Sequence, residues 1–330
     1  MRNEKHKEVW LRLQRRAGAA IGATEGWHWF QYHFSFLPPH PFAFSILDAC
    51  ADCELCIEGL GFRFIDEIAS IQGKEKHLPH YDQLLQKLAE LFVLRQLLGL
   101  AWPQGTVFEH EPAVTAKGKR PELRVVTPER AYLFEVKTPS LLKHAEARSR
   151  NPVQTPGRAL AQSLLEQLAD GRGLTLPRDN PVKDFLIDAD KKFGQFKAVS
   201  AHTSILVIVW DDHVYEPITV LTHGECGLLT PNSYFKDGAG TVVQFPYTDA
   251  VILLRHLNYI QNAAADRPLG DRAHALDFGT VDDLPNVFIP VTAQLDLPAL
   301  ILEGLRTRPL DDPVCQHAAE YHPPDMVLWF

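Results

Sequence analysis

The sequence predicts an α/β fold with a mixed central sheet flanked by helices, and three patterns indicate it. Residues 204–210 read SILVIVW, a nearly continuous β-branched run that is typical of a strand covered on both faces. Residues 81–100 carry leucine and phenylalanine at helical spacing around most of the circumference, which predicts a buried helix. Three short extended segments follow this helix, at 106–111, 121–126 and 131–137. We therefore expect the order helix, strand, strand, strand, helix, strand between about residues 81 and 211.

Two further regions flank this predicted core. Residues 1–80 are rich in aromatic residues and helical patterns, and we expect a mainly helical N-terminal region there. Residues 212–330 form a C-terminal α/β extension to which the sequence assigns no role. The other expected elements are helices at 158–170 and 182–197, a tight turn at 127–130, strands at 218–221, 241–245 and 287–291, and a strand followed by a helix across 247–264.

Composition excludes several classes of protein. The chain has 330 residues, of which 45% are hydrophobic and 22% charged, as in globular proteins and unlike disordered or fibrous ones. Its longest apolar stretches, 205–210 and 250–254, are far shorter than the roughly 18 residues that cross a bilayer. The N-terminal residues MRNEKHKEVW carry charges where a signal peptide would be apolar, and five cysteines are too few for a disulfide scaffold. We expect a cytoplasmic protein with no membrane partner.

A cysteine trio sits in the N-terminal region at Cys50, Cys53 and Cys56. This spacing can supply thiolates to an iron–sulfur cluster when a fourth ligand comes from elsewhere. Residues three apart also share one face of a helix, where free cysteines pack as small hydrophobic side chains. We favour the packed helical face and regard an iron–sulfur cluster as the less favoured alternative.

Charge is distributed unevenly along the chain. The formal net charge is −8, yet residues 117–158 hold ten Lys and Arg against four acidic residues, which makes this segment +6. Such a strip is compatible with a groove that contacts the phosphates of a nucleic acid. The candidate contacts are Lys117, Lys119, Arg120, Arg124, Arg148 and Arg150.

Two acidic residues and a lysine converge within this basic segment. Side chains alternate along a strand, so Glu135 and Lys137 project from the same face of the predicted strand 131–137. Antiparallel pairing with the strand before it would bring Glu122 beside them. Carboxylate oxygens suit Mg²⁺ or Mn²⁺, and a lysine beside the ion can orient a water molecule or balance charge in phosphoryl transfer.

Pro121-Glu122, a gap of twelve residues and Glu135-Val136-Lys137 together resemble the signature of the PD-(D/E)xK nuclease superfamily. The resemblance implies a restriction-endonuclease-like core, αβββαβ, over about 130 residues. An Asp usually follows the proline in that family, so Glu122 departs from the pattern by one methylene. The resemblance also implies a Glu on the first core helix and a Gln on the helix after the lysine strand. Glu90 matches the former, and Gln162, with Gln167 competing, matches the latter.

The expected function is therefore a metal-dependent nuclease that hydrolyses phosphodiester bonds, with DNA as the expected substrate and Mg²⁺ or Mn²⁺ as cofactor. The expected catalytic residues are Glu90, Glu122, Glu135, Lys137 and Gln162, of which the first three would bind the metal. A homodimer is one arrangement that the sequence leaves open. Two alternatives remain: a nucleic-acid-binding or interaction protein with an inactive site on the same fold, and an iron–sulfur protein.

Other motifs give no support to competing chemistries. The chain has no phosphate-binding glycine loop, no G-x-S-x-G elbow and no dinucleotide fingerprint. Its fifteen histidines are scattered, without the spacing of a structural zinc site. A second acid-x-lysine pair, Asp190 and Lys192, falls in a helical pattern and is not expected to belong to the site.

Overall fold

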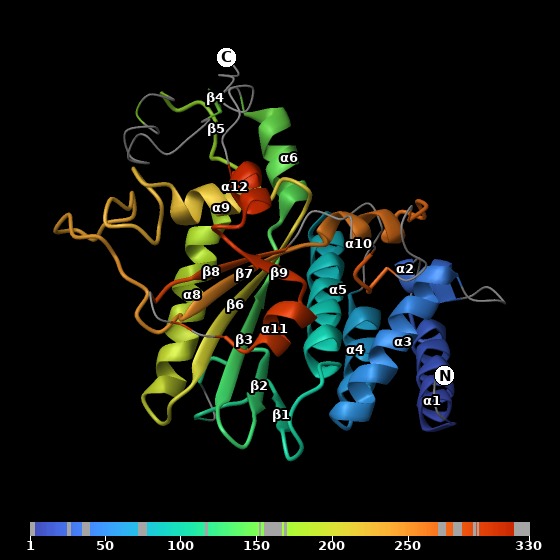
Figure 1. Ribbon diagram of the computed structural model, residues 1–330. Helices are drawn as coiled ribbons and strands as arrows, with labels where there is room; N and C mark the ends of the chain where they lie inside the picture. The colour runs from blue at the N-terminus through green and yellow to red at the C-terminus, as the bar shows by residue number, and fades with distance from the viewer. Residues whose placement is uncertain are drawn as a thin grey trace.

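A seven-stranded mixed sheet forms the centre of the molecule (Figure 1). The computed structural model describes residues 4–24, 28–34, 40–71, 78–115, 118–151, 153–154, 167, 170–269, 275–279, 286–292, 295 and 297–319. The strands, in their order across the sheet, are β1 (Val107–His110), β2 (Leu123–Val126), β3 (Ala131–Lys137), β6 (Thr203–Trp210), β7 (Ala250–Arg255), β8 (Asn286–Pro290) and β9 (Thr307–Pro309). The predicted α/β fold with a mixed, helix-flanked sheet is confirmed.

Strand directions follow the lengths of the connections. β1, β2 and β3 form an antiparallel meander, and residues 127–130 make the tight turn between β2 and β3, where the Thr127 amide donates to the Arg130 carbonyl at 2.8 Å. β3, β6 and β7 are parallel and need long crossovers, which carry helices. A short two-stranded ladder, β4 (Val153–Gln154) and β5 (Leu174–Thr175), lies outside the main sheet.

Helices cover both faces of the sheet. The N-terminal helices are α1 (Glu4–Gly22), α2 (Trp29–Phe34), α3 (Pro41–Cys56), α4 (Leu60–Ser70) and α5 (Leu78–Leu98). The later helices are α6 (Leu141–Arg150), α8 (Pro181–Lys197), α9 (Tyr215–Thr222), α10 (Leu257–Ala264), α11 (Ala299–Gly304) and α12 (Pro313–Ala319). The described residues before α5 are mainly helical, as expected. In the central part α5, β1, β2, β3, α8 and β6 follow the predicted order, whereas α6 and the short β4–β5 ladder between β3 and α8 were not predicted. Among the described residues, no helix is both long and apolar enough to cross a membrane.

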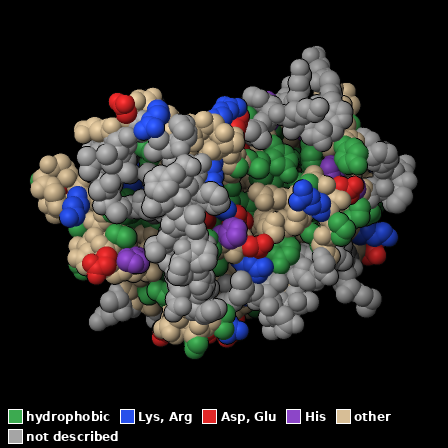
Figure 2. Space-filling view, turned by 90° about the horizontal axis from the view of Figure 1, so that it is seen from above, with side chains coloured by type: hydrophobic (Ala, Val, Ile, Leu, Met, Phe, Trp, Pro, Cys, Tyr) green, Lys and Arg blue, Asp and Glu red, His purple; other side chains and the backbone are tan. Residues whose placement is uncertain are grey.

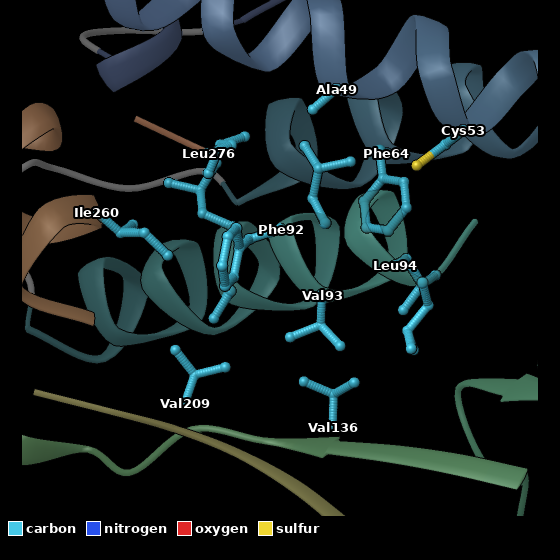
Figure 3. Packing of buried hydrophobic residues seen from close by; sticks show 14 of the residues in the cluster. Ala49, Cys53, Phe64, Phe92, Val93, Leu94, Val136, Val209, Ile260 and Leu276 are labelled. Carbon is cyan, nitrogen blue, oxygen red and sulfur yellow. The ribbon is translucent and has the colours of Figure 1, made fainter. Parts of the chain in front are cut away.

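Helix α5 lies between the sheet and the other N-terminal helices (Figures 1 and 3). Figure 3 shows Val136 of β3 and Val209 of β6 pointing toward α5, where Val93 is fully buried. On its other side α5 packs against α3 and α4, with Phe64 and Cys53 in the same apolar cluster. A helix with neighbours on both sides needs apolar residues all round, which explains the sequence of α5.

The opposite face of the sheet is covered by α8 and α9. Leu133 of β3 and Leu206 of β6 pack there with Leu186 and Phe193 of α8. The alternation along β3 therefore sends one set of side chains toward α5 and the other toward α8. Glu135 and Lys137 belong to the α8 set, because they alternate with Phe134 and Val136, which pack in the α5 cluster.

Two predictions for the C-terminal part are wrong. Residues 218–221 lie in α9, a helix, although Ile218, Thr219 and Val220 are β-branched; burial of this face against the sheet outweighs their intrinsic strand preference. Residues 241–245 form no regular strand: Thr241 accepts a hydrogen bond from the Asp237 amide, and one isolated bridge joins Lys236 and Val242.

The expected elements at 182–197, 287–291 and 247–264 are present. Residues 182–197 fall in α8, and 287–291 correspond to β8. The segment 247–264 holds β7 followed by α10, as predicted. β7, β8 and β9 of the C-terminal part extend the sheet that β1, β2, β3 and β6 begin. The predicted helix at 158–170 falls largely outside the described residues.

Candidate active site

The β2–β3 hairpin brings Glu122 next to Glu135. Leu123 pairs with Phe134 in the antiparallel register, and Glu122 stands one residue before Leu123, just as Glu135 stands one residue after Phe134. The apolar pattern of the two strands fixes this register, since a slip by one residue would turn Leu123 out of the core. The hairpin expected from the sequence thus places the two carboxylates opposite each other, with Lys137 further along the same face.

A metal-capable group forms around Glu122. Glu90 of α5, His110 at the end of β1 and Glu122 each offer a ligand atom, and these atoms lie within 4.8 Å of one another. His110 Nε2 is 3.7 Å from Glu90 Oε1. His110 pairs with Leu123 across β1 and β2, so both residues face α5, where Glu90 lies.

Glu122 is the carboxylate with the most perturbed environment. Burial, followed by the negative charges of Glu90 and Glu135, raises the pKa of Glu122 from 4.5 to about 8. Lys192 and Lys87 oppose this shift but do not cancel it. A cation placed among the three carboxylates would favour the charged form of Glu122.

Glu135 is fully buried and held by two lysines. Its side chain is 0% exposed, and its Oε1 atom accepts from Lys192 Nζ at 2.5 Å and pairs with Lys137 Nζ at 2.9 Å. A buried carboxylate is tolerated when cations compensate its lost hydration, and here β3 and α8 supply one each. The second oxygen, Oε2, is buried and has no hydrogen-bond partner among the described residues.

Lys137 is fixed in its charged form. It donates to Asp188 Oδ2 of α8 at 2.7 Å in addition to its contact with Glu135. Burial alone would lower the pKa of Lys137, but the charge of Glu135 and the bonds to both carboxylates raise it above its ordinary value. Although burial opposes the effect, hydrogen bonds from Lys119 and Lys137 hold the pKa of Asp188 well below its usual range.

Lys87 compensates Glu90. Its Nζ lies 2.6 Å from Glu90 Oε2, one turn away on α5, and 2.9 Å from Glu67 Oε2 of α4. Burial acts to lower the pKa of Lys87, yet these two carboxylates raise it above its ordinary value. Because Lys87 engages Oε2, the other oxygen of Glu90 is left facing His110.

Two of the expected site residues, Gln162 and Lys117, lie outside the described residues. Gln167, the competitor of Gln162, is exposed. The structure therefore brings together Glu90, Glu122, Glu135 and Lys137 of the expected catalytic set.

The described basic candidates occupy different settings. Arg124 on β2 binds Glu109 at 3.0 Å and His202 at 3.1 Å. Arg150, in the last turn of α6, pairs with Glu146. Lys119, Arg120, Arg148 and Arg150 are exposed. Exposed cations of this kind keep the ability to contact a phosphate, because rim ion pairs exchange easily with another anion.

Three residues of the site were not anticipated from the sequence: His110, Asp188 and Lys192. Asp188 and Lys192 are four residues apart on α8, the spacing of an ion pair on one helix face, and that spacing was the available signal. Lys192 had been paired with Asp190, but Asp190 faces away and accepts from the Tyr247 amide at 2.8 Å.

The cysteine trio occupies one face of α3. Cys50 and Cys53 are buried in the apolar cluster under α5, and Cys56 Sγ lies 3.8 Å from the Leu98 carbonyl. Burial raises the pKa of the Cys50 and Cys53 thiols, the opposite of what thiolate ligands require. The favoured packed helical face describes Cys50 and Cys53, whereas Cys56, in the last turn of α3, is exposed.

Comparisons with protein-family models, with curated proteins and with solved structures found no match for this chain. What the site can do chemically follows from its own residues: four carboxylates, one imidazole and three lysines around one partly buried position. Figure 2 views the molecule from the end at which β3 leads into α6, and basic, acidic and histidine side chains lie close together near the middle of that face.

Proposed function

We propose that this protein is a metal-dependent nuclease that hydrolyses phosphodiester bonds, with DNA as its substrate. One observation carries the proposal: the β2–β3 hairpin brings Glu122 and Glu135 together. Glu122 belongs to the metal-capable group, and Glu135 forms an ion pair with Lys137. The resemblance of Pro121-Glu122 and Glu135-Val136-Lys137 to the PD-(D/E)xK signature supports the same function, and it implies a restriction-endonuclease-like core.

The residues present fit a divalent cation. Glu90, His110 and Glu122 would hold it, and Glu135 lies beside Glu122 to complete the negative environment. Two buried atoms in this region, His110 Nε2 and Glu135 Oε2, make no hydrogen bond to the part of the chain that the structure describes, which is costly unless a ligand engages them. When bound, such a cation polarises a phosphate oxygen and lowers the pKa of a water molecule.

Lys137 is the residue we assign to stabilising charge on the phosphate as the bond breaks. It is charged, held between Glu135 and Asp188, and 22% exposed, so its ammonium remains accessible beside the carboxylates. A fixed positive charge in a partly buried site acts more strongly than one in water, and it needs no reorganisation during the reaction. Lys192 keeps Glu135 in place and thereby keeps the position of Lys137.

The test is a cleavage assay on plasmid, linear duplex, single-stranded DNA and RNA, each with and without Mg²⁺ or Mn²⁺. Lys137→Ala should lower cleavage by several orders of magnitude and still bind nucleic acid, because the metal-capable group stays intact. Lys191→Ala, an exposed lysine on α8, is the matched control and should cleave normally. The nuclease assignment is refuted if the wild-type protein cleaves none of these substrates, or if Lys137→Ala cleaves at the wild-type rate.

A nucleic-acid-binding protein with an inactive site is the second candidate. One observation favours it: Glu122 stands where the resemblance expects an Asp, so this side chain is longer by one methylene. This candidate predicts salt-dependent binding without cleavage under all metal conditions. The same assay therefore separates the two.

A further inference from the structure

His110 presents a ring nitrogen, Nε2, to the carboxylates of the site. Its side chain is 8% exposed, and within the described part of the chain Nε2 is buried and makes no hydrogen bond. This atom lies 3.7 Å from Glu90 Oε1 and belongs to the group that also contains Glu122. Lys87 binds the other oxygen of Glu90, so the oxygen nearest the imidazole is the one available for a cation.

The donor set decides which cation fits. Mg²⁺ prefers oxygen ligands in near-ideal octahedral geometry and gains little from an imidazole, whereas the first-row transition ions bind imidazole nitrogen well. Mn²⁺ accepts both carboxylate oxygen and imidazole nitrogen. We infer that His110 makes this site select a transition-metal dication, such as Mn²⁺, over Mg²⁺. The inference rests on the proposed function in placing a cation here, and it adds the identity of the ion.

The other ring nitrogen of His110, Nδ1, faces the guanidinium of Arg63. Ligation through Nε2 requires the tautomer with its hydrogen on Nδ1. Arg63 Nη1 approaches Nδ1 at 3.4 Å, near the limit of a hydrogen bond, and it would have to move aside. Arg63 also binds Glu67 at 2.8 Å and contacts Glu111, so its guanidinium keeps two carboxylate partners after that movement.

Calorimetric titration of metal-free protein with Mn²⁺ and with Mg²⁺ measures the selection directly. The variants are His110→Asn, which offers an oxygen in place of the imidazole nitrogen, and His213→Asn, an exposed control on the loop before α9. We expect wild type to favour Mn²⁺, His110→Asn to reduce the Mn²⁺-to-Mg²⁺ affinity ratio by about tenfold or more, and His213→Asn to leave the ratio unchanged. An equal loss for both ions, or no binding of Mn²⁺ by wild type, overturns the inference.

A second measurement needs no variant to fold. Pulsed electron paramagnetic resonance of the Mn²⁺-loaded wild-type protein should show coupling to a histidine nitrogen, and its absence from the spectrum overturns the inference. The outcome is separate from that of the proposed function. Nitrogen coupling without cleavage of any substrate would refute the nuclease and support the ion selection. Cleavage together with an unchanged affinity ratio in His110→Asn would support the nuclease and refute the ion selection.

Discussion

Glu122→Gln should stabilise the metal-free protein, and the gain should grow with pH. The carboxylate lies among Glu90 and Glu135, and the described residues give it neither an ion pair nor a side-chain hydrogen bond. Gln keeps the size of the side chain and removes the charge. Its replacement therefore relieves the cost of holding a third negative charge in this partly buried position.

The magnitude follows from the pKa of Glu122, which rises from 4.5 in the ordinary side chain to about 8. Between these values the folded protein holds a proton that the unfolded chain releases, so the free energy of unfolding falls as the pH rises. At about 1.4 kcal/mol per pH unit, the full effect is about 3 kcal/mol at pH 7 and about 5 kcal/mol above pH 8. Local relaxation reduces this upper value, and we expect a measured gain of about 1–3 kcal/mol near pH 8.5.

Urea unfolding in the presence of EDTA at about pH 5, 7 and 8.5 provides the measurement. Wild type and Glu122→Gln should have nearly equal stability near pH 5, where Glu122 carries a proton in the folded protein, and should diverge as the pH rises. Glu129→Gln, in the exposed turn of the same hairpin, is the control and should follow wild type. A constant difference at all three pH values, or a less stable Glu122→Gln at pH 8.5, would refute the reasoning.

Two further predictions concern the basic segment and the cysteines. In a Lys117, Lys119, Arg120 triple alanine variant, DNA binding should weaken for all sequences alike, and the slope of log affinity against log salt should fall by about one for each lost phosphate contact. Lys7→Ala on α1 is the control. An unchanged slope in the triple variant would show that these residues do not contact the phosphates. Cys53→Ser should lower the free energy of unfolding by about 1–3 kcal/mol, because it puts a hydroxyl into an apolar cluster, while cleavage stays normal and anaerobically purified protein is colourless. A brown colour of the purified protein would instead support the iron–sulfur alternative.

The part of the site that could be predicted from the sequence is the part that strand geometry fixes. A period of two puts Glu135 and Lys137 on one face, and a four-residue turn between two alternating strands sets the register that brings Glu122 opposite Glu135. The buried helix α5 and the strand β6 were predictable because their apolar patterns leave no face for solvent.

His110 and Lys192 could not be found in this way, because their places depend on contacts between elements. His110 reaches the site only through the register of β1 on β2, and nothing in its own neighbourhood of sequence specifies that pairing. Lys192 reaches Glu135 because α8 packs across β3 with one particular face inward, a rotation that the helical pattern alone leaves open. The wrong strand prediction at 218–221 has the same cause: the packing of α9 overrides the strand preference of β-branched residues such as Ile218.

The charge balance of the site supports Glu122 as the place of the proposed cation. Lys87 compensates Glu90, and two lysines compensate Glu135. Among the described residues, Glu122 alone of the three carboxylates has no cation of its own, and its raised pKa records that imbalance. A lysine or arginine beside Glu122 would balance this charge, but in the proposed nuclease it would compete with the substrate phosphate for the same place. A removable divalent ion supplies the missing charge and leaves coordination positions open for the phosphate and for water.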